Sequence, residues 1–316
     1  MSLDPRTRPL LRLARLLVLG CMLAWAAWAT AAINVTLVLS DSGAIYREAV
    51  DNLRDELAQE NQHWQVRVQT LAARIGSDRE NLVIPLGLRA LQSVLAEPGN
   101  TPVWSLLVPR AEYDQLAARH PAAKRRPLSA LYLDQPLPRQ IQMLMAALPA
   151  TKRLGVLVGS SNTNLAASIR EAAESHGLEV SIERIARADD VVALLADLRG
   201  RVDILLLLPD PQVMDRSMLQ PLMLETYRLH LPVMAYSTQL IGAGAMLALY
   251  TSPGRLGQEA GLRLRQARHN GGVHLPPPAY PDSFDVAVNR SVALSLGIRV
   301  PTSERIHQRM ERNTRR

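Results

Sequence analysis

The segment VDILLLLPDPQVMD, residues 202–215, indicates the class of fold. Five consecutive apolar residues follow Asp203 and end at Pro209-Asp210-Pro211, which predicts a strand buried on both faces. Such strands occur in parallel sheets covered by helices. Open parallel sheets bind ligands beyond the carboxyl ends of their strands, so Asp210 is a candidate ligand-binding residue. The alternative is that Asp210 caps the helix beginning near Asp215, or pairs with a basic neighbour.

The same alternation of strand and helix occurs twice along the chain, with a break around Leu148-Pro149-Ala150. In the first series, INVTLVLS (33–40) predicts a buried strand, and four-residue apolar spacing predicts a helix over 43–60, capped by Asp41 or Ser42. The second series begins with a strand over 153–159 and a helix over 164–177. Repeated strand–helix units predict an α/β protein with two parallel sheets, each flanked by helices.

The positive charge lies mainly at the two ends of the chain. Of the net charge of +7, residues 1–31 carry +3 and residues 304–316 carry another +3, which leaves +1 for the body. A nucleic-acid-binding protein would group basic residues on its fold. The nearly neutral body therefore excludes nucleic acid as the expected partner.

The N-terminus has the pattern of a secretory signal. Four arginines precede the apolar stretch LLVLGCMLAWAAWATAA, which contains the small-residue pattern Ala29-Thr30-Ala31. We expect cleavage after Ala31 and a periplasmic protein; an uncleaved anchor or a lipoprotein attached at Cys21 are alternatives that we rank lower. Because Cys21 is the only cysteine, cleavage would leave a mature chain without a thiol.

Two loops with matching chemistry are expected to line a ligand site. Ser40, Asp41 and Ser42 follow the first strand, while Gly159 to Asn162, including Ser160, follow the first strand of the second series. Both loops stand directly before a helix, where free amide donors suit an anionic or polar ligand. Each residue alone is better explained as an ordinary helix cap, so the prediction rests on the matched pair of loops.

No motif for catalysis or for a cofactor occurs in the sequence. The nucleophile elbow, the phosphate-binding loop, the dinucleotide glycine pattern and the His-Glu-x-x-His motif are absent, and the seven histidines have no metal-ligand spacing. We therefore expect no enzyme activity, no catalytic or metal-binding residue and no cofactor.

Four segments resemble the ABC-transporter substrate-binding family that is related to tryptophan- and tyrosine-binding lipoproteins. They are LDQPLPRQIQMLMAALPATKRLGVLVGSSNTN (133–164), VDILLLLPDPQVMD (202–215), LPVMAYSTQLIGAGAMLALYTSPGRLGQEAG (231–261) and VAVNRSVALSLGIRVP (286–301). The resemblance implies a type I periplasmic-binding fold, in which two lobes joined by a hinge hold a ligand between them. By position it implies ligand contacts from residues in five loops: Ser40 and Asp41, Gly87 and Leu88, Gly159 to Asn162, Asp210, and Tyr236 with Ser237.

The chain departs from the family pattern in the first lobe. The loop after the third strand, usually small and hydroxylated in the family, is Pro85-Leu86-Gly87-Leu88-Arg89 here, and the expected Asp-Pro turn after the fourth strand is Val108-Pro109-Arg110. An aromatic amino-acid ligand therefore does not follow from the resemblance.

The expected organisation is a signal peptide over 1–31, a first lobe over 32–149 with part of the C-terminal return segment, a second lobe over 150–250, and the hinge return with C-terminal helices over 251–316. The leading hypothesis is a monomeric periplasmic protein that carries a small polar or amino-acid-like ligand to an inner-membrane ABC permease. The alternative is a periplasmic sensor or adaptor with the same fold, whose partner is a membrane sensor.

Overall fold

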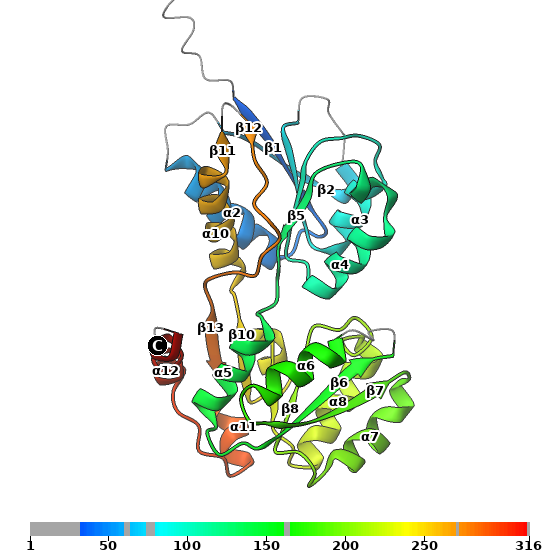
Figure 1. Cartoon of the computed structure of the whole chain (residues 1–316), viewed down its shortest axis with the longest axis vertical. Coiled ribbons are helices and arrows are strands. Elements are labelled where there is room, and N and C mark those ends of the chain that lie inside the picture. Colours follow the sequence, from blue (N-terminus) through cyan, green and yellow to red (C-terminus); the bar gives the residue numbers. More distant parts are fainter. Residues whose placement is uncertain (1–31, 60–63, 74–79, 161–164, 270–271, 315–316) are drawn as a thin grey trace, which may run out of the picture.

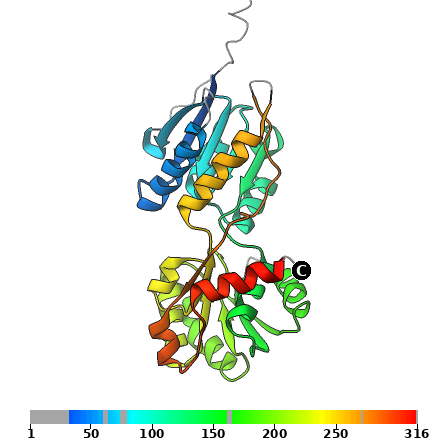
Figure 2. The ribbon, with the colours of Figure 1, turned by 90° about the vertical axis from the view of Figure 1, so that its left-hand side faces the viewer.

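The computed structural model describes residues 32–59, 64–73, 80–160, 165–269 and 272–314, which form two lobes joined by a narrow waist (Figures 1 and 2). The expected signal peptide lies outside the described residues. Within the described ranges, no helix is both long enough and apolar enough to cross a membrane.

The first lobe is a five-stranded parallel sheet in the order β2-β1-β3-β4-β5. Its strands are β1 (Ile33–Leu39), β2 (Trp64–Thr70), β3 (Leu82–Leu86), β4 (Val103–Leu106) and β5 (Leu128–Leu131). Helices α2 (Ala44–Ala58) and α10 (Pro253–Gln266) cover one face, and α3 (Leu88–Ala96) and α4 (Arg110–Arg119) cover the other. The expected strand over 33–40 is confirmed as β1, which ends one residue earlier.

A short hairpin of β11 (Arg268–His269) and β12 (Gly272–Val273) follows α10 in this lobe. The hairpin could not be predicted from the sequence, because two-residue strands have no measurable periodicity.

The second lobe is a six-stranded sheet in the order β13-β10-β9-β8-β6-β7. Its strands are β6 (Arg153–Gly159), β7 (Glu179–Ile185), β8 (Ile204–Leu206), β9 (Val233–Ala235), β10 (Leu247–Tyr250) and β13 (Asp285–Val288). Its helices are α5 (Leu137–Ala147), α6 (Leu165–Glu174), α7 (Val191–Leu198), α8 (Arg216–Arg228), α9 (Thr238–Gly242), α11 (Arg290–Ser295) and α12 (Ser303–Thr314).

One strand of the second lobe departs from the expected all-parallel sheet. Strand β13 pairs antiparallel with β10, whereas the other pairs in this sheet are parallel. Strand β10 runs toward the waist and leads into α10 of the first lobe, while β13 enters the second lobe from the waist (Figure 1). The two strands therefore run in opposite directions because the chain crosses between them twice.

The chain enters the second lobe before the expected boundary at residue 149. Helix α5 packs in the core of the second lobe through Ile141, Met143 and Leu144, together with β6 and α6. The first crossing is therefore the segment between β5 and α5. Two further segments cross the waist: the one between β10 and α10, and the one that returns to β13 (Figures 1 and 2).

Helices α2 and α10 approach each other unusually closely, and glycine makes this possible. A Cβ atom added at Gly257 would lie 2.0 Å from the backbone oxygen of Ala49, and one at Gly261 would lie 2.6 Å from Cβ of Glu56. Larger side chains at these positions would force the two helices apart. The segment after the second crossing is thereby fixed firmly to the first lobe.

Candidate ligand-binding site

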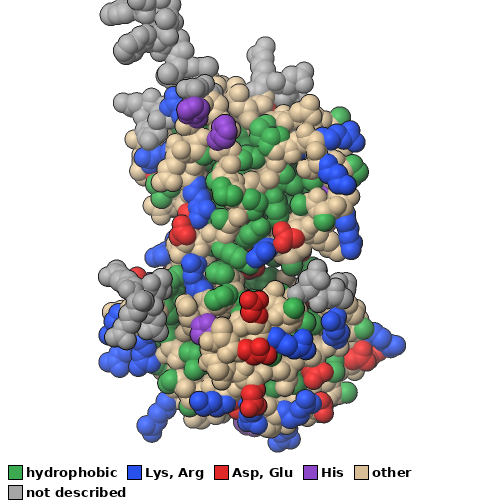
Figure 3. All heavy atoms as spheres, viewed as in Figure 1, with side chains coloured by type: hydrophobic (Ala, Val, Ile, Leu, Met, Phe, Trp, Pro, Cys, Tyr) green, Lys and Arg blue, Asp and Glu red, His purple; other side chains and the backbone are tan. Residues whose placement is uncertain are grey.

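The carboxyl ends of the two sheets face each other across the waist. Strands β1, β3 and β4 of the first lobe run toward it from above, and β6 and β8 of the second lobe run toward it from below (Figure 1). In the space-filling view, the surface is hollowed between the lobes (Figure 3). The loops after these strands are therefore placed where two-lobed α/β proteins bind ligands.

Ser40 is buried at this edge and joins two loops of the first lobe. Its Oγ accepts a hydrogen bond of 2.8 Å from the backbone N–H of Ala90, in the first turn of α3, and it also bonds the Tyr46 hydroxyl. Ser40 therefore caps α3, a helix 50 residues along the chain, instead of the helix that follows it.

Gly87 makes the close contact with Ser40 possible. Its φ of 89° lies in the left-handed region, and a Cβ atom there would lie 2.7 Å from Ser40 Oγ. Leu88 begins α3 and packs against the apolar cluster between the sheet and α3 and α4. Gly87 is thus buried with its N–H bonded to the Leu106 carbonyl, while Leu88 contributes to the core.

Asp41 and Ser42 are exposed at the same edge. The N-cap of α2 is Gly43, without a side-chain cap bond, so the expected cap at Asp41 or Ser42 is not formed in that way. Instead, Asp41 Oδ1 accepts a bond of 3.0 Å from the Gly43 N–H, and Asp41 Oδ2 lies 3.2 Å from Arg89. An exposed ion pair of this kind leaves both groups accessible to a ligand.

Asp210 is buried in the turn after β8, with 2% of its surface exposed. Its Oδ2 accepts from the Gly159 N–H at 3.0 Å, and its Oδ1 accepts from the N–H groups of Gln212 at 3.0 Å and Val213 at 3.3 Å. The cap of α8 is Asp215, which accepts from Ser217, so Asp210 does not cap that helix. Asp210 instead ties the end of β6 to the turn after β8.

Gly159 and Ser160 complete this side of the site. A Cβ atom at Gly159 would lie 2.6 Å from Asp210 Oδ1, so only glycine allows the carboxylate to approach the strand end. The N–H and the hydroxyl of Ser160 both donate to Gln212 Oε1, at 3.0 and 3.2 Å. The Ser160 side chain is exposed, while Asn162 lies outside the described residues.

Tyr236 and Ser237 follow β9 at the same edge. Burial raises the pKa of Tyr236 to about 12, with contributions from Glu112 and Asp134 of the first lobe and its crossing segment. Tyr236 of the second lobe therefore lies within electrostatic reach of both carboxylates. Ser237 is the N-cap residue of α9, without a side-chain cap bond.

Three charged residues near the waist were not among the predicted site residues: Arg110, Glu112 and Asp134. Burial raises the pKa of Glu112, and the negative charges of Asp210 and Asp134 raise it further. The turn Val108-Pro109-Arg110 departs from the family pattern. The charged residues at the start of α4 were the sequence feature that could have indicated this part of the site.

Asp134 and Arg110 are held together at the start of the first crossing. Asp134 Oδ1 accepts a bond of 2.8 Å from the Arg110 N–H, and burial raises the pKa of Asp134 to about 6 in spite of this bond. The Arg110 guanidinium lies 5.7 Å from the centre of the Tyr280 ring and 3.4 Å from its hydroxyl. The guanidinium of Arg110, the carboxylate of Asp134 and the phenol of Tyr280 thus lie together at one edge of the first lobe.

This arrangement can bind a small polar molecule by hydrogen bonds and charge. Carboxylates at Glu112 and Asp134 suit an amine or hydroxyl, and the guanidinium of Arg110 suits an anionic group. In the part of the chain that the structure describes, no group of three or more His, Cys, Asp or Glu side chains is placed to hold a metal ion.

Comparison with solved structures shows the same fold in other proteins. The ABC domain in complex with L-Trp from Streptococcus pneumonia has a TM-score of 0.60 at 14% identity, covering 88% of this chain and 98% of that one. A ligand-free, open substrate binding protein with adhesive properties from Clostridium difficile has a TM-score of 0.66 at 18% identity, covering 86% and 97%. At such identities the matches confirm the type I periplasmic-binding fold.

A third structure extends the comparison. The ABC transporter substrate-binding protein from Desulfitobacterium hafniense in complex with Leu has a TM-score of 0.53 at 11% identity, covering 84% of this chain and 88% of that one. No curated protein matches the sequence. The family model for ABC transporter substrate binding proteins matches residues 47–312, which include nearly all of the second lobe, all three crossings and the first lobe apart from β1 and the start of α2. The chain therefore belongs to the family of ABC transporter substrate-binding proteins.

Proposed function

We propose that this protein is the periplasmic solute-binding component of an ABC importer, and that it holds an amino-acid-like ligand between its two lobes. The observation that carries the proposal is that the carboxyl-end loops of both sheets face each other across the waist, with Arg110 and Asp134 held together at the first lobe's edge. Family membership supports delivery of a solute to an inner-membrane permease.

The chemistry at the waist favours a ligand with both an amine and an acidic group. Glu112 and Asp134 offer acceptors for an ammonium group, while Arg110 offers donors for a carboxylate. Tyr236 and Tyr280 add phenol groups and apolar ring surface. Two structures that share the fold are complexes with L-Trp and with Leu, which supports the same class of ligand here.

The predicted loops are expected to supply the remaining contacts. We assign Ser160, Tyr236 and Ser237 to the second lobe's share of the site, and Asp41 and Ser42 to the first. In this proposal the buried residues Ser40, Gly87, Gly159 and Asp210 hold these loops in place. Two hydrogen bonds support that role: Ser40 accepts from the Ala90 N–H, and Asp210 accepts from the Gly159 N–H.

Mass spectrometry of small molecules released on denaturing the purified protein tests the ligand. We expect one amine-containing compound at close to one equivalent. Glu112→Gln should then weaken its binding about ten- to a hundredfold in calorimetry, because a charge-assisted hydrogen bond contributes about 1.5–3 kcal/mol. Glu171→Gln, on the exposed face of α6, is the control and should leave affinity unchanged. Release of no compound, and no binding from an amino-acid panel, would overturn the proposal.

Import and location need their own measurements. The mature protein should be recovered from the periplasm with an N-terminus near Ala32, and an intact N-terminus or a lipid on Cys21 would contradict this. Deletion of the gene should abolish uptake of the released compound. Unchanged uptake with retained binding would identify the protein as a sensor or adaptor instead.

A further inference from the structure

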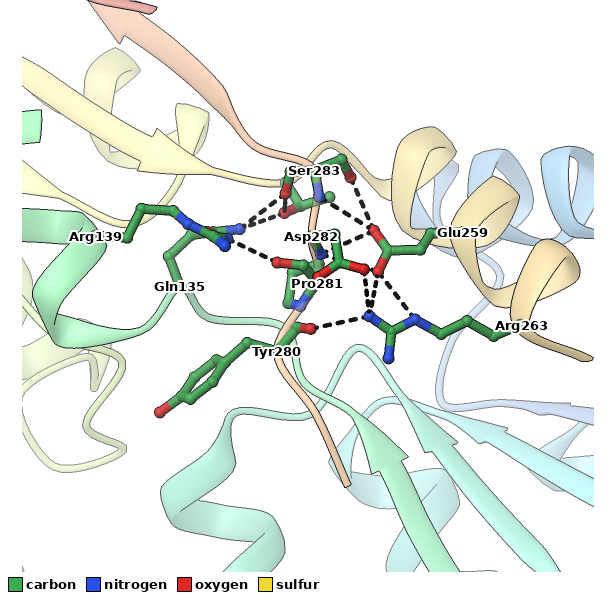
Figure 4. A network of polar contacts seen from close by, with 9 residues as sticks. Gln135, Arg139, Glu259, Arg263, Tyr280, Pro281, Asp282 and Ser283 are labelled. Atoms are coloured by element: carbon green, nitrogen blue, oxygen red, sulfur yellow. Dashed lines mark hydrogen bonds and ion pairs between the residues drawn. The ribbon is translucent and has the colours of Figure 1, made fainter. Parts of the chain in front are cut away.

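The three crossing segments meet at one polar cluster, formed by Gln135 and Thr251, which are buried, and Ser283, which is half-buried. Figure 4 shows Gln135 and Ser283 side by side in this cluster. Gln135 Nε2 donates to Thr251 Oγ1 at 2.6 Å and to the Ser283 carbonyl at 3.2 Å, and Thr251 Oγ1 donates to the same carbonyl at 2.8 Å. Each crossing contributes one residue. Any change in the angle between the lobes must therefore move the crossing segments that form this cluster.

Glu259 of α10 binds the third crossing on the side of the first lobe. Its carboxylate accepts from the Asp282 N–H at 2.9 and 3.1 Å, from the Ser283 N–H at 3.2 Å and from the Ser283 hydroxyl at 3.0 Å. Only 12% of the side chain is exposed. These bonds fix the backbone of the third crossing to a helix that belongs to the first lobe.

Arg263, one turn further along α10, completes this attachment. It donates to Glu259 through Nε at 3.1 Å and Nη2 at 2.7 Å, and its Nη2 also reaches the Tyr280 carbonyl at 3.3 Å and Asp282 at 3.0 Å (Figure 4). Because α10 is itself packed closely on α2, residues 280–283 move with the first lobe.

Arg139 binds the same segment from the second lobe. It lies on α5 and donates to the Pro281 carbonyl at 2.7 Å and to Gln135 Oε1 at 2.6 Å, and its guanidinium lies 5.5 Å from the centre of the Phe284 ring. Residues 281–284 therefore connect α5 of the second lobe to α10 of the first lobe. If this segment were released from α10, the two lobes could adopt a wider range of angles.

We infer that Glu259 is a positioning residue that sets the angle between the two lobes by holding the third crossing against α10. The inference rests on the proposed function, since this angle places the loops of the two lobes around a ligand. Glu259 lies among the crossing segments, away from the loops that we assign to the ligand. It acts on the site through the backbone of residues 280–283.

The test is the distribution of distances between the lobes in the ligand-free protein. Spin labels at Gln115→Cys on α4 and Ser168→Cys on α6, both exposed, report this distance in a full-length Cys21→Ser background. Glu259→Gln removes the charge opposite Arg263 and places an amide donor against N–H groups. We expect a broader distribution than wild type, with an added population at changed distance. Ser283→Ala removes only one bond and should broaden it less.

Glu56→Gln is the matched control. Glu56 of α2 is buried and pairs with Arg265 of α10, so this variant weakens the first lobe without touching a crossing. It should lower thermal stability and leave the distance distribution as in wild type. If Glu259→Gln and Ser283→Ala both give the wild-type distribution, the inference is refuted. No ligand is used, so this result is independent of the mass-spectrometric test of the proposed function.

Discussion

Replacing Asp210 by asparagine should destabilise the protein even without a ligand. The carboxylate accepts from three backbone N–H groups at 3.0, 3.0 and 3.3 Å, and asparagine offers only one oxygen. Its amide nitrogen would face the N–H of Gly159 or those of Gln212 and Val213, donor against donor. One lost charge-assisted bond is worth about 1.5–3 kcal/mol, and a buried unpaired donor adds to this loss.

We therefore expect the free energy of unfolding to fall by about 2–3 kcal/mol in Asp210→Asn. For a chain of this size, that corresponds to a melting temperature lower by about 4 °C. Circular dichroism during heating of the ligand-free protein measures the shift. Asp215→Asn is the control, because asparagine caps a helix nearly as well as aspartate and α8 should keep its cap.

An unchanged melting temperature for Asp210→Asn would refute the role of this carboxylate in joining β6 to the turn after β8. Calorimetry with the released ligand then tests whether Asp210 also contacts the ligand. A loss of affinity much larger than that of other equally destabilised variants would show that Asp210 also contacts the ligand.

Two further predictions concern packing and pH. Gly257→Ala should destabilise by about 1–3 kcal/mol in chemical unfolding, because its Cβ would lie 2.0 Å from Ala49 O, whereas Gly242→Ala, with no atom within 4 Å, should change little. The raised pKa of Asp134, about 6, means that the native state holds a proton that the unfolded state has lost, so stability should fall by roughly 2 kcal/mol between about pH 4 and pH 6. Asp134→Asn should remove this fall, and an unchanged pH profile would contradict the assignment.

Most of the strands and helices were predictable because their signals are local. The apolar run over 204–208 predicts a buried strand from neighbouring residues alone, and β8 forms within it. Helix α2 forms within the predicted residues 43–60, since four-residue apolar spacing needs no distant partner. The antiparallel direction of β13 was not predictable for the opposite reason, because it depends on where the chain returns from the first lobe.

The candidate site was predictable only as a set of loops. The sequence placed Ser40, Gly159, Asp210 and Tyr236 after strands, and the structure has them at the facing ends of the two sheets. It contained no indication that Ser40 caps α3 or that Asp210 binds the Gly159 N–H, since each bond joins residues about 50 positions apart. The charges at Arg110 and Asp134 were visible in the sequence, but the bond that holds them together at the start of the first crossing was not.

The sequence by itself determined the α/β class, the two series of strands and helices, and the strand ends at which a ligand site is expected, because these follow from periodicity over a few residues. Tertiary structure decided which loops meet, which carboxylates are buried, and how the crossings are tied. Gln135, Thr251 and Ser283 lie more than 30 residues apart in sequence and form one cluster only after both lobes have folded. Contacts of that kind depend on the packing of whole elements, which no short stretch of sequence encodes.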